Sequence, residues 1–306
     1  MFDPTDPRAS LSSSSPPIAL PGEFAAADYG RFYDEAPQES TPQERTWYLR
    51  GQNFIVAYTL AQPGAVLGRP SQPDEYMALI PRAETTVEVS AGAEARTVNG
   101  HSLIIVPPGE SRIIMPQGGE IVRLFTTRSP DLVAKCANAA SYLNPRANIP
   151  PFEAWPAPPD GYRIRSYSLD VPAEPGRFGR IFRCTTLMVN VLDPQQGPRD
   201  VTKLSPHHHD DFEQGSLALQ GTFTHHLRWP WTPNMNQWRE DEHAILASPS
   251  LTVIPPPAIH TSRGMDAGIN QLVDIFSPPR LDFSAKPGWV LNADDYPMPT
   301  PSASAA

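Results

Sequence analysis

Proline is spaced so closely along this chain that long helices are excluded. There are 38 prolines among 306 residues, and a proline in a helix interior removes a backbone donor and clashes with the preceding turn. Only residues 131–142 combine an acidic start with the helical spacing of apolar residues, and they predict one short helix. The chain must therefore fold mainly as short extended segments joined by turns.

The extended segments are visible as short runs of β-branched and aromatic residues. Each run is bounded by Pro, Gly, Asp or Asn, and the clearest are NFIVAYTL, SLIIVPP, EIVRLFTT, TLMVNVL, GSLALQGTF, SLTVIPP and NQLVDIF. Many short strands separated by turn residues are typical of an antiparallel sandwich or barrel. We therefore predict an all-β fold.

These runs occur twice in the same order. YLRGQNFIVAY matches IFRCTTLMVNV at an offset of 133 residues, and PDEYMALIP matches FEQGSLALQ at 139. Further on, IIVPPGESR matches TVIPPPAIH at 148, and VRLFTTRSP matches VDIFSPPR at 151. Steadily rising offsets are expected when the second copy of a duplicated unit has longer loops, and the insert RWPWTPNMNQWREDEH is the main addition. The pattern predicts two β-domains in tandem.

Composition divides the chain into five parts. Residues 1–42 are rich in Ser, Pro and Ala, so we expect a disordered or arm-like N-terminus. The first β-domain spans 43–145 with the short helix at its end, and a Pro-rich linker covers 146–178. The second β-domain spans 179–285, and 286–306 form a C-terminal arm packed across the body.

Charge and hydropathy exclude several classes of partner. The formal charge is −9, and no Lys/Arg cluster would follow a phosphate backbone, so nucleic acid is not expected. No apolar run approaches the ~18 residues of a membrane span, and the N-terminus has no apolar signal-peptide core. Cys136 and Cys184 form no Cys-x-x-Cys pair. We therefore expect a cytoplasmic protein, with no membrane partner, that acts on a small molecule.

Histidines in the second β-domain have the spacing of metal ligands. His207 and His209 are one residue apart, so on an extended strand both imidazoles point to the same face. His260 follows about 50 residues later, on a predicted strand that can lie beside them. Imidazole nitrogens with an oxygen donor suit Fe(II), Mn, Zn, Ni or Cu and leave coordination positions open.

These residues resemble the two motifs of the cupin family. The first motif is His-x-His, three or four residues, Glu or Gln, six residues and Gly, and it is matched by His207, His209, Gln214 and Gly221. The second, Pro-x-Gly-x-x-His, is matched by Pro255 to His260, with Pro257 where glycine is usual. The resemblance implies a bicupin: two jelly-roll (double-stranded β-helix) barrels in tandem, with the metal motif kept only in the C-terminal barrel. It also implies pairing as a homodimer.

Two neighbouring residues compete for the fourth ligand position. Gln214 keeps the six-residue distance to Gly221 and is favoured by the resemblance, whereas a shorter gap would make Glu213 the ligand. Because side chains alternate along a strand, these two residues must face opposite sides. Three neutral imidazoles and an amide leave the ion's charge uncompensated, which favours an anionic substrate. One divalent transition metal is expected, Fe(II) first, with Mn, Zn or Ni as alternatives.

The first copy has no histidine at the corresponding positions. The two histidines of the first motif are replaced by Arg69 and Ser71 or, with the longer gap, by Gly68 and Pro70. Arg112 replaces the third, and only Glu75 survives as a ligand. We therefore expect Arg69, Glu75 and Arg112 to form a buried ion-paired cluster in place of the ion, or else a second anion-binding pocket.

The segment TFTHHLRWPW supplies candidate catalytic residues. Of His225 and His226, one should face the barrel interior as a general base, and Arg228, which shares a face with His226, could hold a carboxylate. We predict a metal-dependent enzyme, an Fe(II)-type dioxygenase or oxidoreductase that acts on a small oxygenated or aromatic acid. The alternatives are a sugar-acid isomerase or lyase with the metal as Lewis acid, and a non-catalytic small-ligand-binding cupin.

Overall fold

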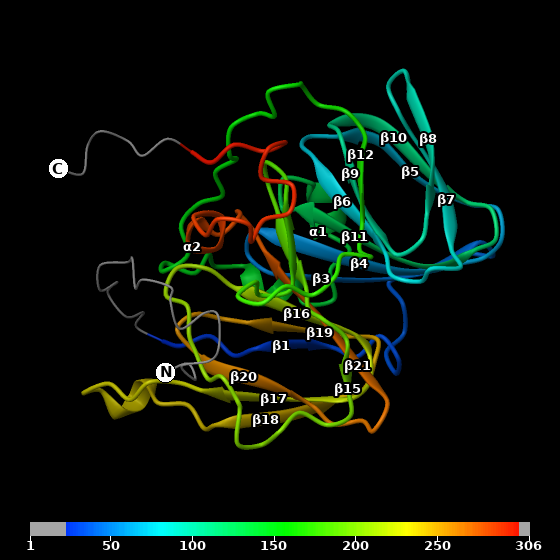
Figure 1. Cartoon of the computed structure of the whole chain (residues 1–306). Helices are drawn as coiled ribbons and strands as arrows, with labels where there is room; N and C mark the ends of the chain where they lie inside the picture. Colours follow the sequence, from blue (N-terminus) through cyan, green and yellow to red (C-terminus); the bar gives the residue numbers. More distant parts are fainter. Residues whose placement is uncertain (1–22, 300–306) are drawn as a thin grey trace.

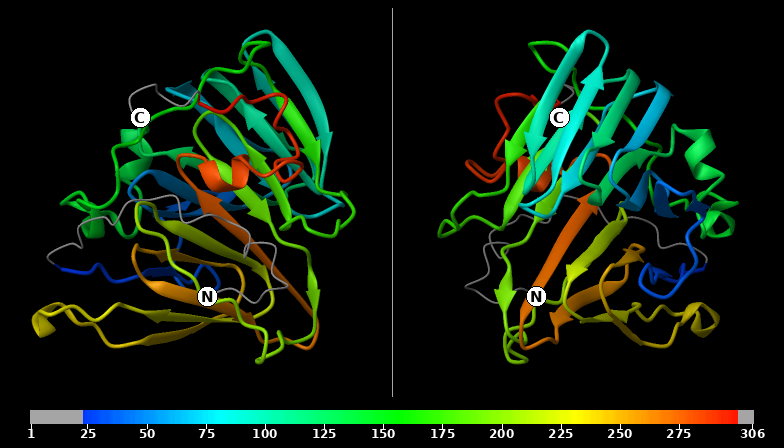
Figure 2. Two further views of the ribbon diagram at one scale, coloured as in Figure 1. Left: turned by 60° about the vertical axis from the view of Figure 1, so that its left-hand side comes forward. Right: turned by 90° about the vertical axis from the view of Figure 1, so that its right-hand side faces the viewer.

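Antiparallel sheets stacked in layers form the body of the molecule (Figure 1). The computed structural model describes residues 23–299. Two sheets are built mainly from the first half of this range, which we call the N-terminal unit, and two from the second half, the C-terminal unit. Figure 2 shows the two units stacked on each other. The fold class is all-β, as the short strand runs predict.

The N-terminal unit pairs a large sheet with a small one. Its strands are β2 Glu39–Ser40, β3 Glu44–Arg50, β4 Phe54–Ala61, β5 Ala65–Gln72, β6 Tyr76–Ile80, β7 Thr86–Ala91, β8 Glu94–Asn99, β9 Ser102–Val106, β10 Gly109–Met115, β11 Gly119–Thr126 and β12 Arg165–Ser168. The seven-stranded sheet has the order β12-β9-β6-β11-β4-β3-β2, and the four-stranded sheet has the order β5-β10-β7-β8.

The C-terminal unit has the same plan. Its strands are β1 Asp28–Gly30, β13 Arg180–Arg183, β14 Met188–Val191, β15 Gln195–Gln196, β16 Gln214–Gln220, β17 Phe223–Arg228, β18 Glu242–Leu246, β19 Ser250–Ile254, β20 Ile259–Gly264 and β21 Ile269–Phe276. The large sheet has the order β1-β19-β16-β21-β14-β13, with β15 paired to β21, and the small sheet has the order β18-β17-β20.

The two units share one strand order and exchange their edge strands. In the N-terminal unit β4, β11, β6 and β9 are neighbours in that order, and β14, β21, β16 and β19 repeat it in the C-terminal unit. The edge beside β9 is occupied by β12, which comes from the Pro-rich segment, and the edge beside β19 is occupied by β1. Each large sheet is therefore completed by the segment that precedes the other unit.

The largest apolar cluster lies between the two large sheets. It joins residues of β4, β6, β9 and β11 to residues of β14, β16, β19 and β21. Alternation along β6 shows how both faces are used, because Met77 and Leu79 enter this cluster while Tyr76, Ala78 and Ile80 fill the N-terminal unit's own interior. A strand buried on both faces explains why YMALI is continuously apolar.

The interiors of the two units differ in chemistry. The N-terminal interior is filled by a second apolar cluster drawn from both of its sheets. The corresponding face of the C-terminal large sheet carries buried polar side chains instead, namely Asn190, Gln214, Ser216, Ser250, Thr252 and Asp274. Because buried polar groups persist only where they are partnered or serve a ligand, the C-terminal interior is the candidate location of a functional site.

Helical structure is limited to short segments. The helix expected over 131–142 is instead two separate turns, α1 Pro130–Val133 and the 3₁₀ turn η2 Ala139–Tyr142. Asn138 interrupts it because its side chain accepts from Arg50 N at 3.0 Å and donates to Arg50 O at 2.8 Å. The other helical segments are η3 Met235–Gln237 and α2 Leu281–Ser284. Within residues 23–299 every helix is too short to cross a membrane.

The segments flanking the units are tied to them. Residues 1–22 and 300–306, on which part of the expected disorder and arm structure falls, lie outside the described range. Near the C-terminus, Leu291 N donates to Ile181 O at 2.8 Å, and the Tyr296 hydroxyl donates to Glu75 at 2.8 Å. The segment after α2 therefore contacts the C-terminal unit and the N-terminal unit.

The packing between the large sheets predicts a strong effect of truncating Leu217 on β16, which is fully buried there. Leu217→Ala should lower the free energy of unfolding by about 2–5 kcal/mol, because lost transfer energy and a residual cavity add. Guanidinium denaturation measures the change. Leu281→Ala, at a side chain 58% exposed on α2, is the control and should stay within about 0.5 kcal/mol of the parent. Equal unfolding midpoints for the two variants would contradict this packing.

Candidate metal centre

Three histidines from remote segments meet at one end of the C-terminal interior. His207 and His260 pair through reciprocal backbone hydrogen bonds, His207 N to His260 O at 3.1 Å and His260 N to His207 O at 2.7 Å. His209 completes the group, and the candidate ligand nitrogens of the three residues lie within 4.8 Å of one another. In the described part of the chain this is the one group of three or more histidine, cysteine and acidic side chains close enough to share an ion.

Backbone carbonyls orient two of the three rings. His207 Nδ1 lies 3.0 Å from Ser205 O, and His260 Nδ1 lies 2.9 Å from Ala258 O. A ring nitrogen facing a carbonyl must carry the proton, so the lone pair of each neutral ring is on Nε2. This is the usual arrangement behind a metal-binding histidine, where the second nitrogen donates to a fixed acceptor.

His209 is enclosed by aromatic rings. Phe212 stacks on it with ring centroids 4.4 Å apart, and Phe276 meets it edge-on at 6.2 Å. Burial holds the pKa of the His209 imidazole well below 6.5, and the nearby Arg280 guanidinium lowers it further. The ring is therefore neutral at physiological pH, which is the form that binds a metal.

Gln214 supplies an oxygen to the same point. Its Oε1 lies 3.1 Å from His209 Nε2 and 3.4 Å from His260 Nε2. Its Nε2 donates to Ser216 Oγ and to Asp274 Oδ1, both at 3.0 Å, so the amide cannot turn without losing two hydrogen bonds. Two ligand atoms about 2.1 Å from one ion and at right angles are about 3 Å apart. The spacing of these donors therefore fits a shared transition metal.

Glu213, the alternative fourth ligand, faces away from the histidines. Its carboxylate accepts from the Tyr142 hydroxyl at 3.0 Å, from the Arg146 guanidinium and from Gln52 N. Alternation along the extended chain puts Glu213 and Gln214 on opposite sides. The geometry thus places Gln214, and not Glu213, beside the histidines.

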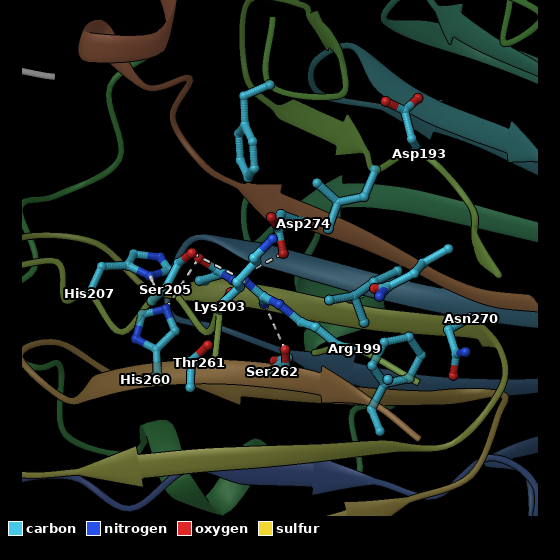
Figure 3. A pocket seen from close by; sticks show the side chains of 17 residues that line it. Asp193, Arg199, Lys203, Ser205, His207, His260, Thr261, Ser262, Asn270 and Asp274 are labelled. Carbon is cyan, nitrogen blue, oxygen red and sulfur yellow. Dashed lines mark hydrogen bonds between the residues drawn. The ribbon is translucent and has the colours of Figure 1, made fainter. Parts of the chain in front are cut away.

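A cavity of about 330 Å³ opens directly onto His207, His260 and Gln214. Figure 3 shows the two histidines at one end, Asn270 at the other and Asp274 between them. Cationic side chains line one wall, Arg199 and Lys203. Apolar side chains line other parts, Phe178, Leu192, Phe223 and Leu272. The volume suits a small molecule, and a few polar groups among apolar ones are typical of such sites.

Arg199 is held in place on the cavity wall. Its Nη1 donates to Ser262 O at 3.0 Å, and its Nη2 donates to Lys203 O and Ser205 Oγ, both at 3.1 Å. Ser205 is also the residue whose carbonyl orients His207. The segment between β15 and β16 therefore builds both the cationic wall and one side of the metal centre.

His225 is the interior member of the histidine pair on β17. It is 1% exposed, and its Nδ1 hydrogen-bonds with Ser262 Oγ at 2.8 Å. Its Nε2 is buried without a hydrogen-bond partner in the described part of the protein. Burial lowers the pKa of His225 to about 3, with a smaller contribution from His260. A histidine with so low a pKa is neutral at physiological pH and accepts a proton poorly.

His226 and Arg228 lie on the outer face of the small sheet, away from the metal centre. His226 Nδ1 is 2.8 Å from His243 Nδ1 across β17 and β18, and Arg228 is exposed and paired with Asp241 at 2.9 Å. Strand alternation explains the placement. Because His225 points inward, His226 and Arg228, one and three positions later, must point outward. The sequence alone indicated His226 as a candidate general base and Arg228 as a carboxylate-binding residue. Their position on the outer face corrects both predictions.

Among the described residues, tyrosine and serine side chains take the equivalent point of the N-terminal unit in place of histidines. Register identifies Tyr76 as the counterpart of Gln214, since Tyr76 pairs with Val106 and Gln214 pairs with Ile254, and these partners are matched in the repeat. The Tyr76 hydroxyl hydrogen-bonds with Ser111 at 3.0 Å. The sequence alignment, which matched Glu75 to Gln214, is therefore one residue out of register.

The register shift of one residue separates the side chains that were expected to cluster. Arg69 is buried and paired with Asp131, Glu75 hydrogen-bonds across the unit boundary to Thr185, and Arg112 is exposed. The expected Arg69–Glu75–Arg112 cluster does not form, because a one-residue shift on a strand moves a side chain to the other face.

Two residues of the site have weaker sequence signals. Asp274 is the one acid among the apolar residues of LVDIF, and it shares a strand face with Leu272. That pattern could have identified Asp274 as an interior polar group. Arg199 lies in an irregular segment without strand periodicity, and its place on the cavity wall is set only by the fold.

Comparisons with known proteins support the fold. No family model matches the chain, and no curated protein matches it. An oxalate decarboxylase from Lactobacillus farciminis, solved as a formate complex, is 15% identical with a TM-score of 0.55 over 87% of this chain and 90% of that one. The oxalate decarboxylase from Bacillus subtilis at pH 4.6 is 13% identical with a TM-score of 0.56 over 84% and 77%. At these identities the likeness shows the fold alone, and that fold is the bicupin fold predicted from the sequence motifs.

The hydrogen bond from Gln214 to Asp274 gives a test of the ligand geometry. Asp274→Asn replaces an acceptor with an amide that can present its own N–H groups to Gln214, so the Gln214 oxygen should lose its fixed orientation. We expect the dissociation constant for Zn(II) or Co(II) to rise by about 10–100-fold, measured by competition with a chromophoric chelator. Asp241→Asn, on the outer face, should bind as the parent does. Parent-like affinity of Asp274→Asn would rule out this orienting role.

Proposed function

We propose that this protein is a metal-dependent enzyme that acts on a small carboxylate-bearing substrate in the cavity of the C-terminal unit. His207, His209, His260 and Gln214 would hold one divalent transition metal. The observation that carries the proposal is the convergence of three imidazoles and one fixed amide oxygen on a point that opens into a substrate-sized cavity. A bound ion would supply Lewis-acid or redox chemistry at its open coordination positions.

The charge of the cavity favours an anionic substrate. The four proposed ligands are neutral, so they leave the charge of a divalent ion uncompensated. Arg199 and Lys203 line the cavity together with Asp193 and Asp274, so the formal side-chain charges balance and the excess positive charge would come from the ion. A carboxylate would thus meet an ion on one side and a guanidinium on another, and charge-assisted hydrogen bonds of this kind fix both position and orientation. The oxalate decarboxylases of the same fold, by their names, also act on a carboxylate.

Within this class, we favour an Fe(II)-dependent dioxygenase or oxidoreductase on a small oxygenated or aromatic acid. Phe178 and Phe223 give the cavity aromatic walls that suit an aromatic or partly apolar substrate and exclude water. A sugar-acid isomerase or lyase needs a side chain that takes up a proton near neutral pH. Burial lowers the pKa of His225, the interior histidine, and so weakens it as a proton acceptor. Its bond to Ser262 orients the Ser262 hydroxyl on the cavity wall.

Metal content tests the proposal directly. Protein produced without a histidine tag should carry about one Fe or Mn per chain by elemental analysis. His207→Ala and His260→Ala should both lose the metal, whereas His226→Ala, which changes an outer-face histidine, should keep it. Oxygen consumption with a panel of small acids then separates a dioxygenase from an isomerase or a binding protein. Retention of the metal in both inner variants would refute the site.

The cationic wall gives a second test. Arg199→Gln should weaken the binding of benzoate or formate to the metal-loaded protein by about tenfold or more, since a hydrogen bond to a charged group is worth about 1.5–3 kcal/mol. Isothermal titration calorimetry measures the affinity. Arg228→Gln removes a guanidinium from the outer face and should change the affinity less than about twofold. If both variants bind these anions equally well, Arg199 does not contact the substrate.

A further inference from the structure

Two buried glutamates occupy corresponding places in the repeat. Each accepts hydrogen bonds from residues outside the sheets of its own unit. Glu213 directly precedes β16, and Glu75 directly precedes β6. Glu213 accepts a hydrogen bond from Gln52 N in the turn between β3 and β4, and Glu75 accepts one from Thr185 N in the turn between β13 and β14. Gln52 and Thr185 are 133 residues apart, the offset that relates these turns in the sequence repeat. The contacts are therefore reciprocal.

The Glu213 contact is built from residues outside the C-terminal sheets. Besides Gln52 N, its carboxylate accepts from the Tyr142 hydroxyl at 3.0 Å and from the Arg146 guanidinium. Glu213 is only 4% exposed. Gly51 permits the close approach, since a Cβ there would lie 2.7 Å from Glu213 Oε2. The three hydrogen-bond donors to Glu213, and the glycine that makes room for its carboxylate, thus all come from outside the C-terminal sheets.

The Glu75 contact has the same form. Its carboxylate accepts from Thr185 N at 3.2 Å, from Thr185 Oγ1 at 2.7 Å and from the Tyr296 hydroxyl at 2.8 Å. It is fully buried. Each glutamate therefore binds one turn amide and one tyrosine hydroxyl that lie outside the sheets of its own unit.

The residue directly after each glutamate distinguishes the two contacts. After Glu213 comes Gln214, whose oxygen lies 3.1 Å from His209 Nε2. After Glu75 comes Tyr76, whose hydroxyl meets Ser111 and no imidazole. Because adjacent side chains on extended backbone point to opposite sides, holding the Glu213 carboxylate on the N-terminal unit fixes the Gln214 amide toward the histidines.

We infer that Glu213 is a positioning residue for the metal centre, and that the N-terminal unit and the start of the Pro-rich linker hold Gln214 in the ligand set through the Glu213 contact with Gln52, Tyr142 and Arg146. The inference rests on the proposed metal site. The Glu213 contact would give the N-terminal unit a function beyond covering the apolar face of the C-terminal large sheet. A ligand held from behind by fixed hydrogen bonds is expected to bind its ion more tightly than one left to thermal motion.

The repeat provides its own control. Glu213→Gln and Glu75→Gln each neutralise one of the two corresponding carboxylates, and Tyr142→Phe and Tyr296→Phe each remove one hydroxyl from them. We would measure Co(II) affinity by competition with a chromophoric chelator, together with the Co(II) absorption spectrum and the melting temperature of each variant. Glu213→Gln should weaken Co(II) binding about tenfold and Tyr142→Phe about threefold. Glu75→Gln and Tyr296→Phe should stay within about twofold of the parent, although their melting temperatures fall comparably.

The outcomes separate the inference from the proposed function. A parent protein that binds no Co(II) at the histidines overturns both. A parent that binds Co(II), with equal losses in the Glu213 and Glu75 variants, overturns only the inference, since general loosening between the units would then explain them. If Glu213→Gln does not fold, Tyr142→Phe decides, because it changes no charge. Parent-like affinity and an unchanged Co(II) spectrum in that variant would likewise overturn the inference.

Discussion

The face-to-face packing of the two seven-stranded sheets is the constraint on which the rest of the molecule depends. Each large sheet buries one face against the other unit, so only its second face remains to line an interior. In the N-terminal unit that second face is apolar and the interior is filled. In the C-terminal unit it carries Gln214, Ser216 and Asp274, and the interior keeps a cavity. One architecture thus gives a solid core in one copy and a polar chamber in the other.

The two copies are also bound by exchange of small parts. β1 and β12 each complete the opposite sheet, and Glu75 and Glu213 each accept a hydrogen bond from a turn of the opposite unit. Buried charged groups require partners of this kind, because an unpaired carboxylate in a dry interface would cost several kcal/mol. The repeated fold is therefore better described as two interlocked halves than as two independent domains, and the candidate metal centre lies beside one of these contacts.

The sequence predicted the large features and missed those set by local register. Short runs bounded by turn residues indicated the strands, and the spacing of His207, His209 and His260 indicated three imidazoles that the structure brings together. The alignment of Glu75 with Gln214 is one residue off, since spacing along the chain does not reveal a different loop length before a strand. Which of His225 and His226 points into the interior likewise depends on the pairing of β17 with β20. Arg199 lies in irregular chain, where no periodicity is available to read.

The central claim is that His207, His209 and His260, with Gln214, surround one ion inside the C-terminal unit. Anomalous X-ray diffraction from crystals of the metal-loaded protein, collected on both sides of the metal's absorption edge, tests it most directly. The account predicts a single strong peak bonded to the three Nε2 atoms and to the amide oxygen of Gln214, at the end of the cavity. A peak on the His226 and His243 pair of the outer face instead, or at Glu213, with none among the three inner histidines, would contradict it.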